Sequence, residues 1–194
     1  MPKKKEKPPQ IPHFSQNIEG WCNFWSFYRE IAEWIPDGGT WVEVGTYWGQ
    51  SFGYAVVECL NRGKKIDLVG VDMFAWPSPE GWPMIQKFHH EMRHVTGHYR
   101  AIQGTSWEVA AQFEDASVDF VFIDADHIYE HVKKDVLAWL PKVKPGGIIA
   151  GHDYNPPHEV ERAVNEIFGS RVIPIPSDDF DPEHRPFYSW KVQL

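Results

Sequence analysis

The stretch "WVEVGTYWGQSFGYA", residues 41–55, decides the fold, because an apolar strand pattern runs here into a glycine-containing turn and then into a helical pattern. It contains two overlapping signatures. Gly49, Ser51 and Gly53 spell G-x-S-x-G, the turn that carries the nucleophile of serine α/β-hydrolases. The other signature, E-x-G-x-x-x-G, starts at Glu43 and describes a strand followed by a loop that cradles a nucleotide-like ligand.

The hydrolase interpretation puts Ser51 in the wrong part of this segment. A nucleophilic serine sits directly at the strand-to-helix turn, whereas this strand already ends at Gly45 and Ser51 falls within the first turns of the helix. About 40 residues precede the motif, and they contain no earlier strand with an oxyanion loop. Asp124 and His152 do follow in the order that such a triad requires. A hydrolase therefore stays as the weaker alternative.

The cradle interpretation fits the residue types better. Gly45 and Gly49 allow a close turn against a ligand, and the following helix offers free backbone N–H groups. Neither a G-x-G-x-x-G fingerprint nor a Walker lysine is present. Glu43 would repel a pyrophosphate but suits a ligand with an amino group. Asp72, at the end of the next strand, suits a ribose hydroxyl pair. Together these acids favour S-adenosylmethionine (SAM) over a dinucleotide.

Strand patterns and helix patterns alternate along the rest of the chain. The strand-like runs are 40–45, 66–72, 99–104, 118–126 and 146–153, followed by "RVIPIP" and "PFYSWKVQL" near the C-terminus. The helical runs are 49–63, 106–113, 129–143 and 158–169. This alternation predicts an α/β fold with a Rossmann-like, doubly wound, mostly parallel seven-stranded sheet and an antiparallel C-terminal edge strand. Ligand-binding residues are then expected where the parallel strands end, at one rim of the sheet.

The overall composition indicates one soluble domain. The chain has 194 residues and a formal net charge of −8, which disfavours nucleic acid as a partner because Lys and Arg are in deficit. Residues 1–10 are expected to form a disordered basic tail and residues 11–194 a single domain. No apolar run is long enough to cross a membrane, and Cys22 and Cys59 form no disulfide framework. A cytoplasmic location is therefore expected.

Aromatic residues are abundant, with 10 Trp, 12 Phe and 7 Tyr. Residues 18–36 space their apolar side chains as an amphipathic helix does, and this helix is expected either to cover the cofactor or to form a homodimer surface. The aromatic-rich insertion 73–100 follows the ribose-binding strand and is expected to form a lid or an acceptor wall. Four histidines of the insertion lack an acid cluster and are expected on the surface. They are His89, His90, His94 and His98.

Five segments resemble the motifs of class I SAM-dependent methyltransferases, both in their order and in their spacing. They are "EVGTYWGQS", "VGVDMF", "IQGTSWEVA", "VDFVFIDADHIYE" and "KPGGIIAGHDY", within about residues 40–168. The chain looks most like the small metal-dependent O-methyltransferases of the catechol and caffeoyl-CoA type, and like the related bacterial enzymes that modify sugars and macrolides. Each motif alone is weak evidence for this resemblance, whereas five motifs in the same order and spacing are specific evidence.

This resemblance implies a set of cofactor-binding residues. They are Glu43, Gly45, Thr46, Tyr47, Gly49 and Ser51 around the methionine end of SAM, Asp72 and Met73 at the ribose, Thr105, Ser106 and Trp107 at the adenine, and Asp124. On this account Ser51 is a ligand contact and not a nucleophile.

The resemblance also implies a divalent metal, Mg²⁺ or a transition metal such as Mn²⁺, at the ends of two later strands. Asp124 matches a metal ligand, and His152 with Asp153 occupies the position of a second acid followed by Asn or Asp. Mg²⁺ prefers oxygen ligands, whereas imidazole suits transition metals. His152 therefore leaves two alternatives. Either it binds a metal such as Mn²⁺, or it is a catalytic base and no metal binds.

A second candidate base is His127, three residues after Asp124, where the catechol-type enzymes carry a lysine. A neutral imidazole can accept a hydroxyl proton near pH 7. The alternative is that Asp126 and His127 cap the following helix. His131, one turn further on, is expected on a solvated helix face.

The sequence thus predicts SAM-dependent methyl transfer to a hydroxyl of a small molecule or sugar, either with assistance from a divalent metal or with a histidine base alone. One alternative is a SAM-binding protein without transfer activity, and the less favoured one is a serine hydrolase that uses Ser51. Aromatic faces stack on sugars and on phenols alike, so the sequence does not select the acceptor.

Overall fold

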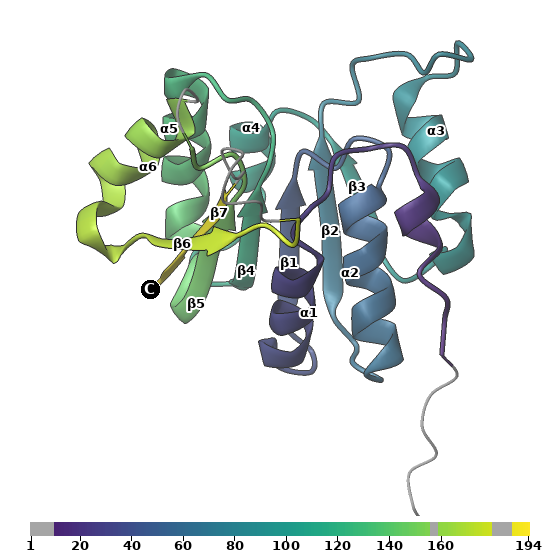
Figure 1. Cartoon of the computed structure of the whole chain (residues 1–194), viewed down its shortest axis with the longest axis horizontal. Helices are drawn as coiled ribbons and strands as arrows, with labels where there is room; N and C mark the ends of the chain where they lie inside the picture. Colours follow the sequence, from purple (N-terminus) through teal and green to yellow (C-terminus); the bar gives the residue numbers. More distant parts are fainter. Residues whose placement is uncertain (1–9, 156–158, 180–187) are drawn as a thin grey trace, which may run out of the picture.

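The computed structural model describes residues 10–155, 159–179 and 188–194, in which one sheet is covered by helices on both faces (Figure 1). The strands are β1 (Thr40–Val44), β2 (Asp67–Asp72), β3 (Arg100–Gln103), β4 (Val118–Ile123), β5 (Val143–Gly151), β6 (Ile173–Pro176) and β7 (Tyr188–Gln193). The α-helices are α1 (Trp25–Trp34), α2 (Gln50–Asn61), α3 (Met84–Glu91), α4 (Ser106–Ala110), α5 (Tyr129–Trp139) and α6 (Glu159–Phe168). The 3₁₀ turns are η1 (Phe14–Asn17), η2 (Met92–Val95), η3 (Leu140–Lys142) and η4 (Gly169–Arg171).

The strand order is β3-β2-β1-β4-β5-β7-β6, and the first five strands in this spatial order run parallel to one another. This confirms the predicted mostly parallel, seven-stranded sheet. The C-terminal strand β7 is antiparallel, as predicted, and it lies between β5 and β6. The outermost strand is therefore β6. Its two prolines, Pro174 and Pro176, have no N–H to donate, which suits a strand with one open side.

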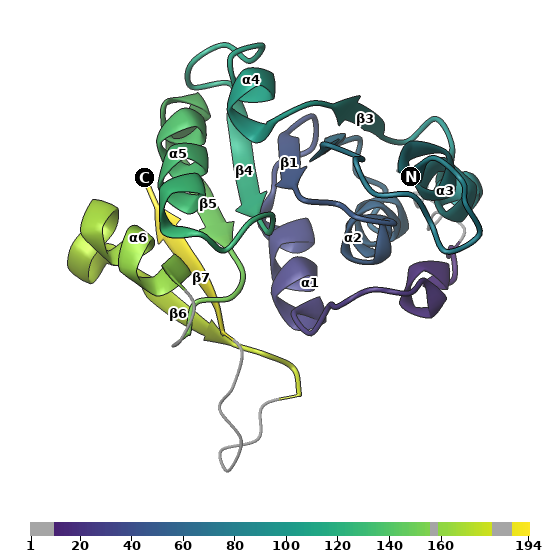
Figure 2. The same cartoon turned by 90° about the horizontal axis from the view of Figure 1, so that it is seen from above.

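Side chains of β1 alternate between two hydrophobic cores, as a strand buried on both faces requires. Trp41 belongs to the core that includes Tyr28 of α1 and Phe52 of α2. Val42 belongs to the core that includes the apolar faces of α4, α5 and α6. Figure 2 shows α1 and α2 on one side of the strands and α4, α5 and α6 on the other. The sheet is thus doubly wound, and its strand ends are left uncovered by these helices.

The N-terminal helix is shorter than predicted. Residues 18–24 of the expected helix 18–36 are not helical, and α1 begins only at Trp25. The reason is a cap supplied from the other end of the chain. The carboxylate of Asp178 accepts a hydrogen bond from the backbone N–H of Ser26 at 2.9 Å, and the Asp178 N–H donates to the Asn23 carbonyl at 2.7 Å. The capped turn leaves the preceding segment free to cross the rim of the sheet.

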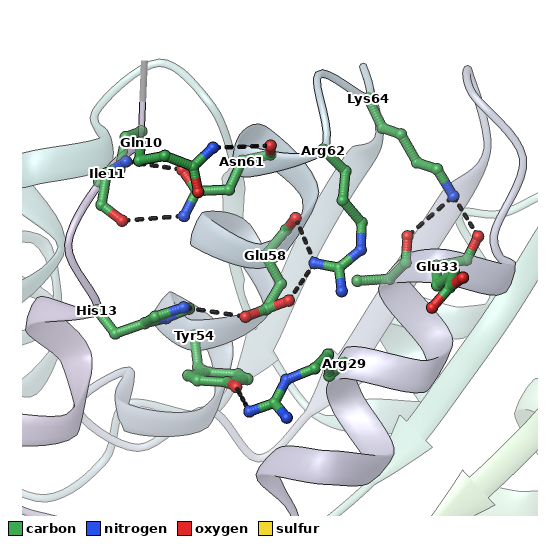
Figure 3. Close-up of polar contacts among 11 residues, drawn as sticks. Gln10, Ile11, His13, Arg29, Glu33, Tyr54, Glu58, Asn61, Arg62 and Lys64 are labelled. Atoms are coloured by element: carbon green, nitrogen blue, oxygen red, sulfur yellow. Dashed lines mark hydrogen bonds and ion pairs between the residues drawn. The ribbon is translucent and has the colours of Figure 1, made fainter. Parts of the chain in front are cut away.

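Polar contacts fasten the start of the described chain to α2 and fasten α1 to the turn after α2 (Figure 3). Ile11 exchanges two hydrogen bonds with Asn61, at 2.7 and 2.9 Å. His13 Nε2 lies 2.9 Å from Glu58 Oε1. Lys64 donates to three carbonyls at the end of α1, at 2.5 to 2.9 Å. Gln10 also contacts Asn61, whereas the other residues of the predicted basic tail lie outside the described residues.

The insertion 73–100 contains α3 and η2. Its histidines are exposed, as predicted, and so are Trp76 and Trp82. Among the described residues, no helix combines the length and the apolar character that crossing a membrane demands. The predicted boundaries, a tail at residues 1–10 and a single domain at residues 11–194, stay predictions.

Candidate active site

The loops that follow the strands at the carboxyl rim carry most of the backbone strain. Four described non-glycine residues have positive φ, and three of them directly follow β1, β2 and β5. They are Tyr47 (φ 48°), Phe74 (φ 47°) and Asp153 (φ 55°). Residues in this region of backbone space cost free energy and cluster at ligand sites. Strained loops therefore follow three of the parallel strands at whose ends the sequence predicts ligand-binding residues.

The loop after β1 turns at two glycines in the left-handed region. Gly45 has a φ of 88°, and a Cβ at this position would lie 1.9 Å from the backbone oxygen of Asp124. Gly49 has a φ of 95°, and a Cβ there would lie 3.0 Å from Met92 Sδ. In this structure both glycines thus permit close packing against the protein itself. The loop after β1 and the loop after β4 are in direct backbone contact.

Glu43 is fully buried beneath the loop after β1, and two hydroxyl groups hold its carboxylate. Tyr28 Oη donates to Oε2 at 2.7 Å, and Ser51 Oγ donates to Oε1 at 2.6 Å. Burial raises the pKa of Glu43 to about 8, although these two hydrogen bonds act to lower it. The nearby Asp124 and Asp72 are acidic as well and raise the Glu43 pKa further. A cationic group of a ligand beside this carboxyl would favour its charged form.

Ser51 does not occupy a nucleophile elbow. It is the second residue of α2, and its hydroxyl is bound to Glu43. This geometry differs from a serine exposed at a strand-to-helix turn and favours the cradle interpretation of the opening stretch.

Asp72 joins the loops after β1 and β2. Its Oδ2 accepts the backbone N–H of Tyr47 at 2.9 Å, and its Oδ1 accepts that of Phe74 at 2.8 Å. Burial raises the pKa of Asp72, while these backbone hydrogen bonds act to lower it. The backbone N–H groups of Thr46 and Met73 also act to lower the pKa of Asp72, so this carboxylate ties together the loops after β1 and β2.

The remaining cofactor candidates lie in the same loops or at the end of the adjacent β3. Met73 follows β2, is exposed, and accepts a hydrogen bond from Gln103 Nε2 through its carbonyl at 3.0 Å. Thr46 is buried, and its hydroxyl oxygen has no partner among the described residues. Such a buried orphan hydroxyl indicates a place for water or a ligand.

The residues predicted at the adenine have additional roles in packing α4. Thr105 Oγ donates to Glu108 at 2.6 Å. Ser106 is buried and accepts the indole N–H of Trp139 at 2.9 Å. The Lys134 ammonium lies 3.5 Å from the centre of a Trp107 ring. These contacts fix α4 against α5, next to the end of β2.

Asp124, His152 and Asp153 come together at the ends of β4 and β5. One ligand atom from each lies within 4.8 Å of the others. His152 Nδ1 is 3.3 Å from Asp153 Oδ2 and 3.9 Å from Asp124 Oδ1. Burial raises the pKa of Asp124 to about 6, although His152 acts to lower it. The predicted ligands thus form one cluster of two carboxylates and an imidazole.

His127 contacts this cluster instead of capping α5. Its Nε2 lies 2.9 Å from Asp153 Oδ2, and this hydrogen bond raises the pKa of His127. Asp126 accepts the backbone N–H of Ile128 at 3.0 Å and lies 2.6 Å from His131 Nδ1. Asp126 thus closes the turn before α5, whereas the N–H of Tyr129, the first residue of α5, donates to Glu159 at 3.0 Å. His131 is the partner of Asp126 on the exposed side of α5.

Asn23 is a site residue that the sequence analysis missed. Its Oδ1 lies 2.9 Å from His152 Nε2, and Nδ1 of the same ring faces Asp124 and Asp153. The Phe24 ring packs 4.9 Å from the same imidazole. Because 129 positions separate Asn23 from His152, only the fold brings the two together. No local sequence signal marks Asn23.

A model of the methyltransferase domain family matches residues 42–154. The chain therefore belongs to this family, and its fold is that of a methyltransferase domain.

Among curated proteins, the chain is 26% identical over 150 residues to protein y4gI of Sinorhizobium fredii strain NGR234. This match covers 75% of the chain and 16% of y4gI, so the chain spans less than a fifth of the length of that relative.

Two solved structures illustrate the likeness of fold. An O-methyltransferase from Bacillus cereus in complex with SAH superposes with a TM-score of 0.64 at 14% identity, over 96% of this chain and 92% of that chain. An rRNA methylase from Streptococcus thermophilus superposes with a TM-score of 0.64 at 10% identity, over 91% and 98%. Both confirm the predicted Rossmann-like architecture. Because an rRNA methylase shares it, the exclusion of nucleic acid stays a prediction.

Proposed function

We propose that this domain transfers the methyl group of SAM to a hydroxyl of a small molecule or sugar, with a divalent cation held by Asp124, His152 and Asp153. One observation carries the proposal. A buried carboxylate suited to a cation and a metal-type cluster lie on neighbouring strands, joined by the contact between Gly45 and the Asp124 backbone.

The cofactor half of the site fits SAM in its charges and in its hydrogen-bonding groups. The Glu43 carboxylate would accept hydrogen bonds from the ammonium group at the methionine end of SAM, and Tyr47 and Ser51 would lie beside this group. Asp72, oriented by two backbone N–H groups, would accept the ribose hydroxyls. SAM supplies the chemistry as a methyl group bound to a positively charged sulfur.

The metal half of the site fits a transition metal such as Mn²⁺ better than Mg²⁺, because one of its three ligands is an imidazole. Asn23 supports this fit, since its contact with Nε2 directs Nδ1 of His152 toward the two acids. When bound, a divalent cation would lower the pKa of an acceptor hydroxyl and orient it.

His127 is the proposed base. Its side chain is 42% exposed, and Asp153 holds its Nε2. When the ring is neutral, the Nε2–H donates to Asp153 and the lone pair stands on Nδ1. A proton from the acceptor hydroxyl would move to this nitrogen as the oxygen attacks the methyl group.

The acceptor is expected to present a ring face. Exposed apolar side chains stand on the loops at the carboxyl rim: Trp21, Met73, Trp76, Trp82 and Ile128. The Trp21 ring lies 5.5 Å from that of Tyr47, in the cofactor loop. Such faces stack on aromatic and sugar rings. The net charge of −8 supports a neutral small acceptor over nucleic acid. The homodimer and the cytoplasmic location stay predictions.

Titration calorimetry with SAH, the demethylated cofactor, tests the proposal. Wild-type protein should bind SAH, and Asp72→Ala should weaken binding by about 100-fold, because two hydrogen bonds to a charged group are lost. Absence of SAH binding would reject the methyltransferase assignment. SAH binding without any Mn²⁺ binding would reject the metal-assisted mechanism and favour a SAM-binding protein or a base-only mechanism.

A further inference from the structure

Tyr28 reaches the candidate active site from outside the part of the chain that the family model matches. It lies in α1, whereas the match begins at residue 42. Its side chain is fully buried, and its hydroxyl donates to Glu43 Oε2 at 2.7 Å. The sequence predicts that the helix within residues 18–36 covers the cofactor or forms a homodimer surface, and Tyr28 gives this helix a specific contact with the site.

Three aromatic rings fix the orientation of the Tyr28 ring. Trp41 and Phe122 meet it edge-on, each with ring centres 5.0 Å apart, and Phe24 packs at 4.9 Å. Edge-to-face packing of this kind restricts a buried ring. The hydroxyl of Tyr28 is therefore presented to Glu43 from a rigid position.

The Glu43 carboxylate receives one hydroxyl donor on each oxygen, from two different helices. Ser51 of α2 holds Oε1, and Tyr28 of α1 holds Oε2. The terminal torsion of a glutamate side chain is soft, so one donor alone would leave the carboxylate plane free to turn. Two donors from separate elements fix this plane.

The two hydroxyls leave part of the acceptor capacity of Glu43 unused. An ionised carboxylate offers about four lone-pair sites, and each hydroxyl occupies one. A buried carboxylate is costly unless it is paired with a cation, and the acidic neighbours Asp124 and Asp72 make this environment more unfavourable for a negative charge. An ammonium group of a ligand would relieve it.

We propose that Tyr28 is a positioning residue for recognition of the amino-acid end of the cofactor: it holds the plane of the Glu43 carboxylate so that the unused lone pairs face the ligand's ammonium group. The inference rests on the proposed function, because it presupposes a cofactor of the SAM type.

The test compares two ligands that differ only at the recognised end. SAH carries the amino acid, whereas 5′-methylthioadenosine shares the adenosine and the thioether and lacks it. In calorimetry, Tyr28→Phe should raise the Kd for SAH about tenfold, since one hydrogen bond that orients a charged group is lost. The Kd for 5′-methylthioadenosine should stay within twofold of wild type.

Tyr54→Phe is the matched control. Tyr54 is also a buried tyrosine, and its hydroxyl accepts a hydrogen bond from Arg29 at 3.0 Å, on the side of α2 shown in Figure 3. Its removal should leave both Kd values unchanged. If Tyr28→Phe weakens both ligands equally, or neither, Tyr28 has only a packing role and the inference is overturned.

A second variant keeps the inference testable if Tyr28→Phe does not fold. Glu43→Gln should weaken SAH at least tenfold and spare 5′-methylthioadenosine, and retained SAH affinity in this variant would overturn the inference. Wild-type protein that binds 5′-methylthioadenosine as tightly as SAH would also overturn it while leaving nucleoside binding intact. Wild-type protein that binds neither ligand would reject the proposed function itself, which is a distinct result.

Discussion

Glu43 and Asp124 stand on neighbouring strands at the same rim, yet different groups hold their carboxylates. Glu43 is completely buried and accepts hydrogen bonds from the hydroxyls of Tyr28 and Ser51. Asp124 is partly exposed and faces the imidazole of His152, which in turn contacts Asp153. Burial raises the pKa of both acids, to about 8 for Glu43 and about 6 for Asp124.

Because different groups hold the two carboxylates, Glu43 and Asp124 are suited to two different tasks within one site. Hydroxyl donors remain in place whatever the ligand does, so the Glu43 corner suits recognition of a fixed positive charge. Imidazoles can give up a proton or bind a metal, so the corner of Asp124, His152 and Asp153 suits chemistry at an acceptor oxygen. Three substitutions test this division, from the largest expected effect to the smallest, and a fourth tests a buried acid outside both corners.

The two corners meet at Gly45, and Gly45→Ala should have the largest effect. A Cβ would lie 1.9 Å from the Asp124 carbonyl oxygen, at a φ of 88°. We expect a loss of roughly 4 kcal/mol or more in the free energy of unfolding, measured by urea denaturation. Gly146→Ala is the control, because Gly146 has a φ of 81° with nothing near its Cβ, and should cost about 1–2 kcal/mol. If both substitutions lowered the free energy of unfolding equally, the loop after β4 would have to move readily to make room for the Cβ at Gly45.

Asp153→Asn removes the acid that both His127 and His152 contact. Mn²⁺ affinity and methyl transfer should each fall by about 10²–10³-fold, because the cluster loses a charged ligand. The Kd for SAH should stay within about twofold. Asp126→Asn is the control, since Asp126 contacts Ile128 and His131 instead. A parallel fall in SAH affinity for Asp153→Asn would show that the corners act as one unit.

Asn23→Leu should weaken Mn²⁺ binding by about 10–100-fold, as expected when a metal-ligating histidine loses the partner of its other nitrogen. SAH affinity should not change. The measurement is a titration of Mn²⁺ into the protein that is monitored by calorimetry. Unchanged Mn²⁺ affinity would show that Asn23 does not orient His152.

Asp135→Asn tests a buried acid that belongs to neither corner and has no proposed ligand. Burial raises the pKa of Asp135 to about 6, above its usual value of about 3.9. The folded state therefore binds more protons than the unfolded state between these values, and stability falls as pH rises from about 4 to 6. The variant should gain about 1–3 kcal/mol at pH 7 in urea denaturation, and this gain should vanish below about pH 4. An equal difference at both pH values would contradict this account.

The strands and the rim could be predicted from the sequence because their signals are local. The predicted strand 66–72 ends at Asp72, as β2 does, and the predicted strand 118–126 starts with β4 but continues three residues beyond its end at Ile123. The start of α1 could not be predicted in the same way. Its amphipathic pattern extends back to residue 18, but Asp178 caps the helix from more than 150 positions away.

The sequence by itself determined the doubly wound sheet, the acids at the strand ends and the glycine turn after β1, because strand burial and glycine turns depend on nearby residues. Only the tertiary structure decided which groups complete the site. Asn23 and Tyr28 carry no motif, and they reach His152 and Glu43 because α1 is capped late and packs over β1 and β4. Such contacts depend on how distant segments pack, which no local pattern encodes.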